Sequence, residues 1–191
     1  VIRARPCVAS AQRAHRGRAL AASVLGSSIA FIDSSVVNVA LPKLQHEMAA
    51  GLAAMQWVVN AYLLPLGALI LVGGVLGDRL GQRTVFVWGV ALFTLASVAC
   101  ALSSSLVMLS SARVLQGLGA AGMMGVNAAL VRFTYPQAML GRALGINALV
   151  VAVSAAIGPT IAAAILAVGQ WRWLFAINIP IGVLALAIGS L

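Results

Sequence analysis

Long apolar runs, separated by short polar stretches, dominate the chain. Runs of about 18 or more apolar residues recur along its length, and each is long enough to cross a hydrocarbon core of about 30 Å as a helix. We count six, at about residues 20–41, 55–76, 85–102, 106–131, 143–168 and 174–191. The runs are continuous rather than alternating, and backbone in lipid must satisfy its polar groups within its own segment. The sequence therefore predicts an all-α integral membrane protein.

The charge distribution predicts how these helices are oriented. Hydrophobic residues make up 62% of the chain and charged residues 8%, against roughly a quarter charged in a soluble domain. Nine of the twelve Lys and Arg residues fall on one side of the predicted spans: Arg3, Arg5, Arg13, Arg16, Arg18, Arg79, Arg83, Arg132 and Arg142. Lys43 and Arg172 fall on the other side, so the positive-inside rule places the N-terminus in the cytoplasm, with the bacterial cytoplasmic membrane as the expected location. The net charge of +9 reports topology, and we expect no nucleic-acid partner.

Residues 1–19 form a basic cytoplasmic leader before the first span. The leader resembles the start of a signal peptide, but the apolar run after it is too long for one, so we expect a retained helix. Cys7 and Cys100 have no paired or metal-type spacing, and His15 and His46 lie outside the spans. Without a nucleotide-binding glycine loop or a nucleophile beside a general base, we expect no enzyme, no metal and no cofactor.

Two ionisable residues lie within apolar runs, where an Asp or Arg costs roughly 2.5 to 3.5 kcal/mol unless it faces a bundle interior or a wet cavity. Asp33 lies in the first span, which we expect to end at Pro42 and the polar KLQHE stretch. Asp33 is either a buried acid neutralised by a neighbour or a group that takes up and releases a proton. Asn38 lies about 140° around the helix from Asp33, so the two need not share a face.

Arg113 is the second ionisable residue, and it lies in the fourth span with Gln116 one turn further on. It either faces the interior or extends to a nearby membrane interface. Small residues follow it every four positions at Gly117, Ala121 and Gly125, and every three at Gly119, Gly122 and Gly125. Because these spacings let another helix approach closely, we expect a packed central helix.

Gly158 and Pro159 interrupt the fifth span. A proline removes a backbone donor and crowds the preceding turn, so we expect a bend there. The sequence leaves two interpretations open for this bend, a hinge that moves and a packing joint that does not.

The densest mixed-charge cluster, GGVLGDRLGQRT at residues 73–84, lies between the second and third spans. Such a short connection must turn tightly, and Gly81 permits the backbone angles that a tight turn needs. Asp78 can accept hydrogen bonds from a helix N-terminus, and Arg79 and Arg83 can reach headgroups, carboxylates or helix C-terminal carbonyls. An inert hairpin would need fewer of these features.

This stretch resembles the signature between the second and third helices of the major facilitator superfamily. The matching positions are Gly74, Leu76, Asp78, Arg79, Gly81 and Arg83, whereas Gly77 replaces a small Ala and Gln82 replaces a basic residue. Four further stretches resemble motifs of its fourteen-span drug:proton antiporters, in the right order: IDSSVVNVALP (32–42), LSSARVLQGLGAA (109–121), GPTIAA (158–163) and WRWLFAINIPIG (171–182). Two alanines replace the final glycines of the antiporter motif in GPTIAA. Five ordered matches make the resemblance specific.

The resemblance implies a fold and a set of roles. The fold is the N-terminal six-helix half of such a transporter, built from two inverted three-helix repeats around a midplane cavity. Asp33, with Asn38 nearby, is then the proton-coupling or substrate-facing acid, and Arg113, with Gln116, is the buried cation that tunes its neighbours. Gly74, Asp78, Arg79, Gly81 and Arg83 form a cytoplasmic latch, and Gly158 with Pro159 forms the antiporter hinge.

The function expected from this resemblance is proton-coupled efflux of an amphipathic or cationic small molecule. The partners are protons, the substrate, the lipid bilayer, and either a C-terminal half that this sequence lacks or a second copy of the chain. Two alternatives stay open. One is export of a metabolite by the same fold, and the other is a truncated membrane fragment that transports nothing.

Overall fold

A computed structural model describes residues 6–190 and the side chains of residues 17–190. The described chain is helical throughout apart from short connections, as the continuous apolar runs predict. The helices are α1 (Pro6–Glu47), α2 (Leu52–Leu80), α3 (Gln82–Ala101), α4 (Leu106–Thr134), α5 (Gln137–Val168), α6 (Arg172–Ala176) and α7 (Asn178–Ser190). With α6 and α7 taken together, this part of the chain has six helices long and apolar enough to cross a membrane. The prediction of an all-α membrane fold with six transmembrane helices is confirmed.

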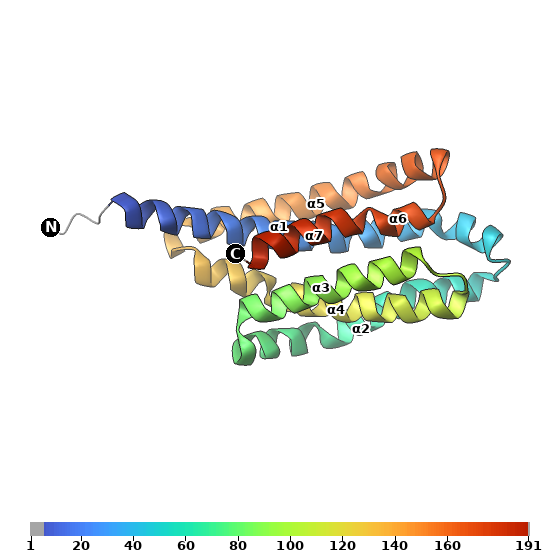
Figure 1. Cartoon of the computed structure of the whole chain (residues 1–191), viewed down its shortest axis with the longest axis horizontal. Coiled ribbons are helices and arrows are strands. Elements are labelled where there is room, and N and C mark those ends of the chain that lie inside the picture. Colours follow the sequence, from blue (N-terminus) through green and yellow to red (C-terminus); the bar gives the residue numbers. More distant parts are fainter. Residues whose placement is uncertain (1–5, 191) are drawn as a thin grey trace.

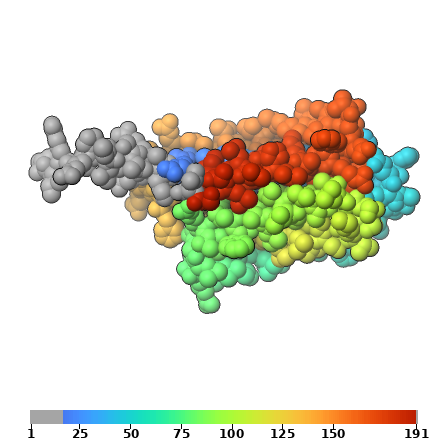
Figure 2. All heavy atoms as spheres, viewed as in Figure 1, coloured from blue at the N-terminus to red at the C-terminus, as the bar shows by residue number. Residues whose placement is uncertain are grey.

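The helices form two groups that lie side by side (Figure 1). In one group α4 packs against α2 and α3, and in the other α1 packs against α5 and α7. The first helix of each three-helix repeat therefore packs mainly against the second and third helices of the other repeat. Contacts between α1 and α4 and between α3 and α7 join the two groups. The space-filling view shows α3 and α7 in contact along one face (Figure 2).

Helix α4 lies at the centre of its group because its small residues let two neighbours approach closely. A Cβ atom on Gly125 would lie 2.8 Å from the Gly74 nitrogen of α2, and one on Gly119 would lie 2.6 Å from the Phe93 nitrogen of α3. Atoms do not approach so closely without displacement, so these positions hold glycine for backbone contact. Gly117 and Gly125 therefore face α2, whereas Gly119 and Gly122 face α3.

Several helix boundaries differ from the expectation, and α1 differs most because it begins at Pro6 rather than near residue 20. Helix α1 does not end at Pro42 but continues to Glu47, because one lost backbone bond is tolerated when the residues beyond it still form theirs. The sixth span is not one regular helix, since it breaks at Ile177 between α6 and α7. Pro180 lacks an amide hydrogen and frees a carbonyl one turn earlier, at the end of α6, which favours a break there.

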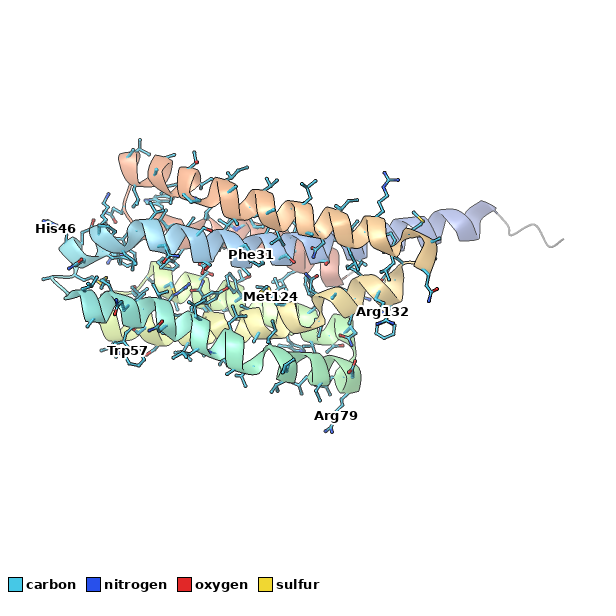
Figure 3. The ribbon with its side chains drawn as sticks, turned by 180° about the vertical axis from the view of Figure 1, so that it is seen from behind. Phe31, His46, Trp57, Arg79, Met124 and Arg132 are labelled. Carbon is cyan, nitrogen blue, oxygen red and sulfur yellow. The ribbon has the colours of Figure 1, made fainter. Side chains whose placement is uncertain are left out.

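Most basic side chains lie at one end of the bundle, which we call the basic end. Arg79 and Arg132 lie there, whereas His46 and Trp57 lie at the opposite end (Figure 3). At that opposite end, Lys43 Nζ donates to the carbonyls of Leu166 (3.2 Å) and Gly169 (2.8 Å). Lys43 thereby caps the C-terminus of α5, where a cation is favoured.

Candidate functional site

Asp33 lies in the middle of the bundle, at the junction of the two helix groups. Its Oδ2 atom forms an ion pair with Nη1 of Arg113 from α4. Its Oδ1 atom accepts hydrogen bonds from Asn178 Nδ2 of α7 (2.7 Å) and from Gln116 Nε2 of α4 (3.2 Å). Asp33 is 1% exposed, so three donors replace the water that this carboxylate has lost. The structure thus joins three helices at one acid.

Arg113 is buried as deeply as its partner, with 1% of its surface exposed. Nη1 also donates to Gln116 Oε1 at 2.8 Å. The guanidinium carbon lies 4.2 Å from the centre of the Tyr62 ring and 5.9 Å from that of Phe175, within the range of cation–π attraction. Arg113 therefore faces the interior, and the alternative that it extends to a membrane interface is wrong for this structure.

Gln116 holds the site together through both ends of its amide. Nε2 donates to Asp33 and to Ser97 Oγ of α3 (2.7 Å). Oε1 accepts from Arg113 and from the thiol of Cys100 (3.2 Å). The contacts with Arg113 and Asp33 require the present orientation of the amide, because a guanidinium only donates and a carboxylate only accepts. We call Asp33, Arg113, Gln116 and Asn178 the Asp33 cluster.

The Asp33 cluster contains one residue that the sequence analysis missed and lacks one that it included. A search for ionisable residues within the apolar runs misses Asn178. A lone amide in such a run also indicates a buried polar contact. Asn38 lies outside the cluster, since it is exposed and its Nδ2 donates to Ser34 O of its own helix (3.0 Å). The angle of about 140° between Asn38 and Asp33 explains this separation.

A small apolar cavity adjoins the cluster on the α1, α2 and α4 side. Its volume is about 140 Å³, and its lining includes Phe31, Tyr62, Leu66 and Met124. Phe31 and Met124 lie near each other between the two helix groups in the rear view (Figure 3). Tyr62 separates this cavity from Arg113, because its ring stacks on the guanidinium. A ligand in the cavity would therefore be close to the Asp33 cluster without touching its charges.

A second polar cluster links α1 to α4 and α5 nearer the basic end. Ser23 donates to Asn127 Oδ1, whose Nδ2 in turn donates to Ser27. Ser27 Oγ donates to Asn147 Oδ1 of α5 at 3.3 Å. The cluster contains no ionisable group, so it can tie the helices together but cannot carry a proton.

The predicted latch residues lie at the basic end, in and around the connection between α2 and α3. Gly81 has a φ of +94°, a conformation that favours glycine, and it is the single residue between the two helices. Asp78 Oδ1 accepts a hydrogen bond from Gln82 Nε2 at 2.8 Å, and Arg79 is exposed. Gly74 packs against α4 rather than at the turn.

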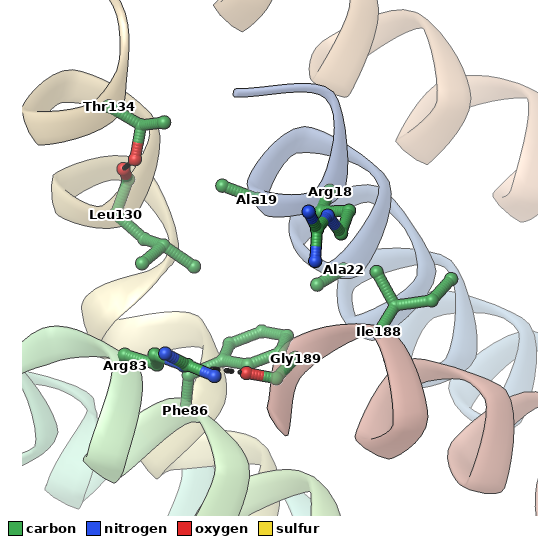
Figure 4. A pocket seen from close by; sticks show the side chains of 9 residues that line it. All are labelled: Arg18, Ala19, Ala22, Arg83, Phe86, Leu130, Thr134, Ile188 and Gly189. Carbon is green, nitrogen blue, oxygen red and sulfur yellow. Dashed lines mark hydrogen bonds between the residues drawn. The ribbon is translucent and has the colours of Figure 1, made fainter. Parts of the chain in front are cut away.

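Asp78 forms no ion pair with Arg79 or Arg83 in the described part of the chain, where the one ion pair is Asp33 with Arg113. The partner of Asp78 is Gln82, which stands where the signature has a basic residue. Gln82 can donate to Asp78 because it lies one helical turn further on. Arg83 Nε instead donates to the carbonyl of Gly189 in the last turn of α7 (2.8 Å), where orphan carbonyls attract cations. Arg83 and Arg18 line a pocket of about 100 Å³ between α1, α3, α4 and α7 (Figure 4).

The predicted hinge residues form a close contact between α5 and α1. A Cβ on Gly158 would lie 2.6 Å from the Cβ of Ser35. Pro159 has no amide hydrogen, so the carbonyl of Ala155 one turn earlier lacks its helical partner. Ser35 Oγ donates to that carbonyl at 3.4 Å. Helix α5 runs on through Pro159, and the hinge stays a prediction.

Comparison with known proteins places the chain in a family. The family model described as Major Facilitator Superfamily matches residues 23–191. The uncharacterized transporter YebQ of Escherichia coli (strain K12) is 50% identical over 163 residues, which cover 85% of this chain and 36% of that protein. The multidrug resistance protein Stp of Mycobacterium tuberculosis is 41% identical over 170 residues, covering 87% of this chain and 31% of that protein. The chain thus spans about a third of the length of the curated relatives it matches.

Solved structures agree with the family. The inward-open xylose transporter XylE from E. coli matches with a TM-score of 0.75 at 16% identity, over 90% of this chain and 46% of that chain. At this identity the likeness shows the fold alone. The matched family and its members are transporters rather than enzymes. With its six apolar helices and a family match over most of its length, this chain is an integral membrane protein that belongs to the major facilitator superfamily.

Proposed function

We propose that the chain forms the N-terminal six-helix half of a proton-coupled multidrug efflux antiporter. The observation that carries this proposal is the Asp33 cluster, in which a fully buried acid is paired with a buried arginine at the junction of the two helix groups. An ionisable residue at this depth is functional by default, because its burial is costly. The relative Stp, whose name is multidrug resistance protein, supports the export of drugs.

Proton coupling follows from the partners of Asp33. The carboxylate is stabilised by Arg113, Gln116 and Asn178, so its deprotonated form fits the present arrangement of helices. Protonation removes the charge that holds Arg113 and weakens the link between α1 and α4. Arg113 stays charged because an arginine does not lose its proton in a protein, and the Tyr62 ring then remains beside it. A proton thereby favours a different arrangement of the helices, which is what coupling requires.

The apolar lining of the cavity beside the cluster supports the proposed substrate class. Aromatic and Met side chains such as Phe31 and Met124 accommodate varied shapes, which suits an amphipathic or cationic drug. The site is completed by a C-terminal half or by a second copy of the chain. The basic end lies in the cytoplasm under the positive-inside rule, with the bilayer of a bacterial cytoplasmic membrane as surroundings.

The two surface motifs have supporting roles in this proposal. Asp78, Arg79 and Arg83, held by the tight turn at Gly81, form a latch that is made and broken as the two halves of the transporter move. Gly158 and Pro159 fix how closely α5 lies against α1. If Asp78→Asn left both the transport rate and the balance of inward- and outward-facing states unchanged, the latch role would be wrong.

Drug uptake into everted membrane vesicles tests the proposal in the protein as its host produces it. An imposed pH gradient should drive uptake of a fluorescent lipophilic cation by the wild type, and Asp33→Asn should abolish the dependence on the gradient. Glu47→Gln is the matched control, since Glu47 is an exposed acid at the end of α1. Gradient-driven uptake by Asp33→Asn would refute the role of Asp33. If neither the wild type nor the control took up any of several drugs, the multidrug assignment would fail.

A further inference from the structure

Asn178 differs from Gln116, the other amide partner of Asp33, in what its second polar atom does. Its Nδ2 donates to Asp33 Oδ1, but its Oδ1 has no hydrogen-bond partner among the described residues, although Asn178 is 0% exposed. A buried oxygen without a donor is uncommon and calls for an explanation. Asn178 begins α7, directly after the break at Ile177.

When Asp33 is protonated, the new O–H needs a hydrogen-bond acceptor, and the two carboxylate oxygens differ in what lies next to them. A proton on Oδ2 would point at Arg113, whose guanidinium has only donors, so two hydrogens would face each other. A proton on Oδ1 meets the amides of Gln116 and Asn178, which also present their nitrogens. One of these amides must turn to offer its oxygen before Oδ1 can hold a proton comfortably.

Asn178 can turn and Gln116 cannot. Turning Gln116 would place its NH2 group against Arg113, which has only donors, and would also disturb its contacts with Ser97 and Cys100. Turning Asn178 by half a turn gives up only its bond to the carboxylate and forms a bond from the new acid O–H to its oxygen. One amide atom is unpartnered in either orientation, so turning Asn178 leaves no additional polar atom without a partner.

We propose that Asn178 is the positioning residue that accommodates the coupling proton, donating to the Asp33 carboxylate and, after its amide turns, accepting from the acid at Oδ1. This inference rests on the proposed role of Asp33 in proton coupling. The proton is transferred from a hydronium ion, so one O–H bond breaks in the hydronium ion as one forms at Oδ1, and a water molecule is released.

The other charged or titratable groups at the cluster are Arg113 from α4, Tyr62 from α2 and Cys100 from α3. In the described chain, α5 and α6 carry only Arg142 and Arg172, both exposed, and α7 carries no ionisable residue. Tyr62 and Cys100 are neutral donors near neutral pH, so Asp33 is the group whose charge changes.

Infrared difference spectroscopy tests this inference on the chain reconstituted in lipid, titrated from high to low pH. The carbonyl stretch of a carboxylic acid moves to higher frequency when its O–H loses a hydrogen-bond acceptor. Asp33→Asn assigns the acid band by removing it. We expect Asn178→Leu, which has similar volume and no polar atom, to raise the frequency of that band. Asn178→Ser should restore it towards the wild-type value, since a hydroxyl both donates and accepts.

Thr94→Val is the control for a general effect of removing a buried polar group. Thr94 is buried on α3 beside Gly182 of α7, but its hydroxyl donates only to Val90 of its own helix (2.7 Å). We expect this variant to keep the wild-type band. If Asn178→Leu did not fold, isotope-labelled Asn in the wild-type chain would replace it. The amide band of Asn178 is the labelled band that Asn178→Ser removes. The measurement then shows whether this amide band changes as the Asp33 acid band appears.

The possible results separate this inference from the proposed function. If the Asp33 acid band had the same frequency in the wild type and in Asn178→Leu, the role of Asn178 would be overturned while that of Asp33 would stand. An Asn178 amide band that did not change on protonation would have the same meaning. If no acid band disappeared in Asp33→Asn at any pH, the proton-carrying role of Asp33 would fail, and the role of Asn178 with it.

Discussion

Replacing Arg113 by Met should destabilise the protein in a way that depends on pH. The change leaves Asp33, 1% exposed, with two neutral amides as its partners. Removing one member of a buried ion pair costs about 3–5 kcal/mol, because the other charge is left uncompensated. A buried acid can avoid most of this cost by binding a proton. We therefore expect a loss of roughly 3 kcal/mol near neutral pH and a smaller loss at lower pH.

The sign of the pH dependence follows from proton binding. In Arg113→Met the folded protein binds a proton at Asp33 that the unfolded chain releases, so stability falls as pH rises. One proton gives a slope of at most about 1.4 kcal/mol per pH unit, or about 2.7 kcal/mol over two units. Asp33→Asn should behave differently. It leaves Arg113 charged at every usable pH, so its loss of stability should be nearly constant.

The double variant Asp33→Asn/Arg113→Met completes the cycle. It has no buried charge in the cluster, so we expect it to be more stable than the sum of the single losses predicts, by at least about 2 kcal/mol. Thermal unfolding of the chain in detergent, followed by circular dichroism over a range of pH, measures all four proteins. Losses that added up, or an Arg113→Met variant with a flat pH profile, would show that the two charges are not paired as described.

Two helix contacts give further predictions. Gly119→Ala should lower the unfolding temperature, because overpacking against Phe93 costs about 1–3 kcal/mol and outweighs a helix-propensity gain of up to about 1 kcal/mol. Gly122→Ala should keep or raise the unfolding temperature, because the nearest atom to its added Cβ lies at an ordinary contact distance of 3.5 Å. Equal melting temperatures for the two variants would contradict the packing of α3 on α4. Ser35→Ala should lower the free energy of unfolding by about 1 kcal/mol in the wild type, because the Ala155 carbonyl loses its hydrogen-bond donor. In Pro159→Ala, where a backbone amide again donates to that carbonyl, the same change should have no effect. An equal loss in both backgrounds would exclude the hydrogen bond from Ser35 to Ala155.

Several features of the fold could be predicted from the sequence because physics leaves little choice. Apolar runs of membrane length must be helices, since backbone in lipid has no other partner. The regular spacing of glycines in the fourth span predicted close contact with other helices. Gly119 packs on α3 and Gly125 packs on α2. The cost of burying charge in lipid predicted that Asp33 would face inward, whereas the sequence left Arg113 the alternative of a nearby membrane interface, which its burial excludes.

The pairings within the site could not be predicted in the same way. An amide costs less to bury than a charge, so Asn178 carried a weaker signal than Asp33 did, and its contact with Oδ1 depends on how α7 packs against α1. The partner of Asp78 is decided by which side chain reaches it, and Gln82 does so from the next turn. Spacing did anticipate that Asn38 could lie on another face from Asp33, but it did not show which neighbours each would have.

The most direct test of proton coupling at Asp33 is to count the protons released when a drug binds the purified protein. In weakly buffered detergent solution with a pH indicator, a drug that binds the deprotonated form should release up to about one proton per chain, since Asp33 is the one acid within the spans. Release should vanish in Asp33→Asn and persist in Glu47→Gln. Undiminished release from Asp33→Asn, with drug binding intact, would contradict the assignment of the coupling proton to Asp33.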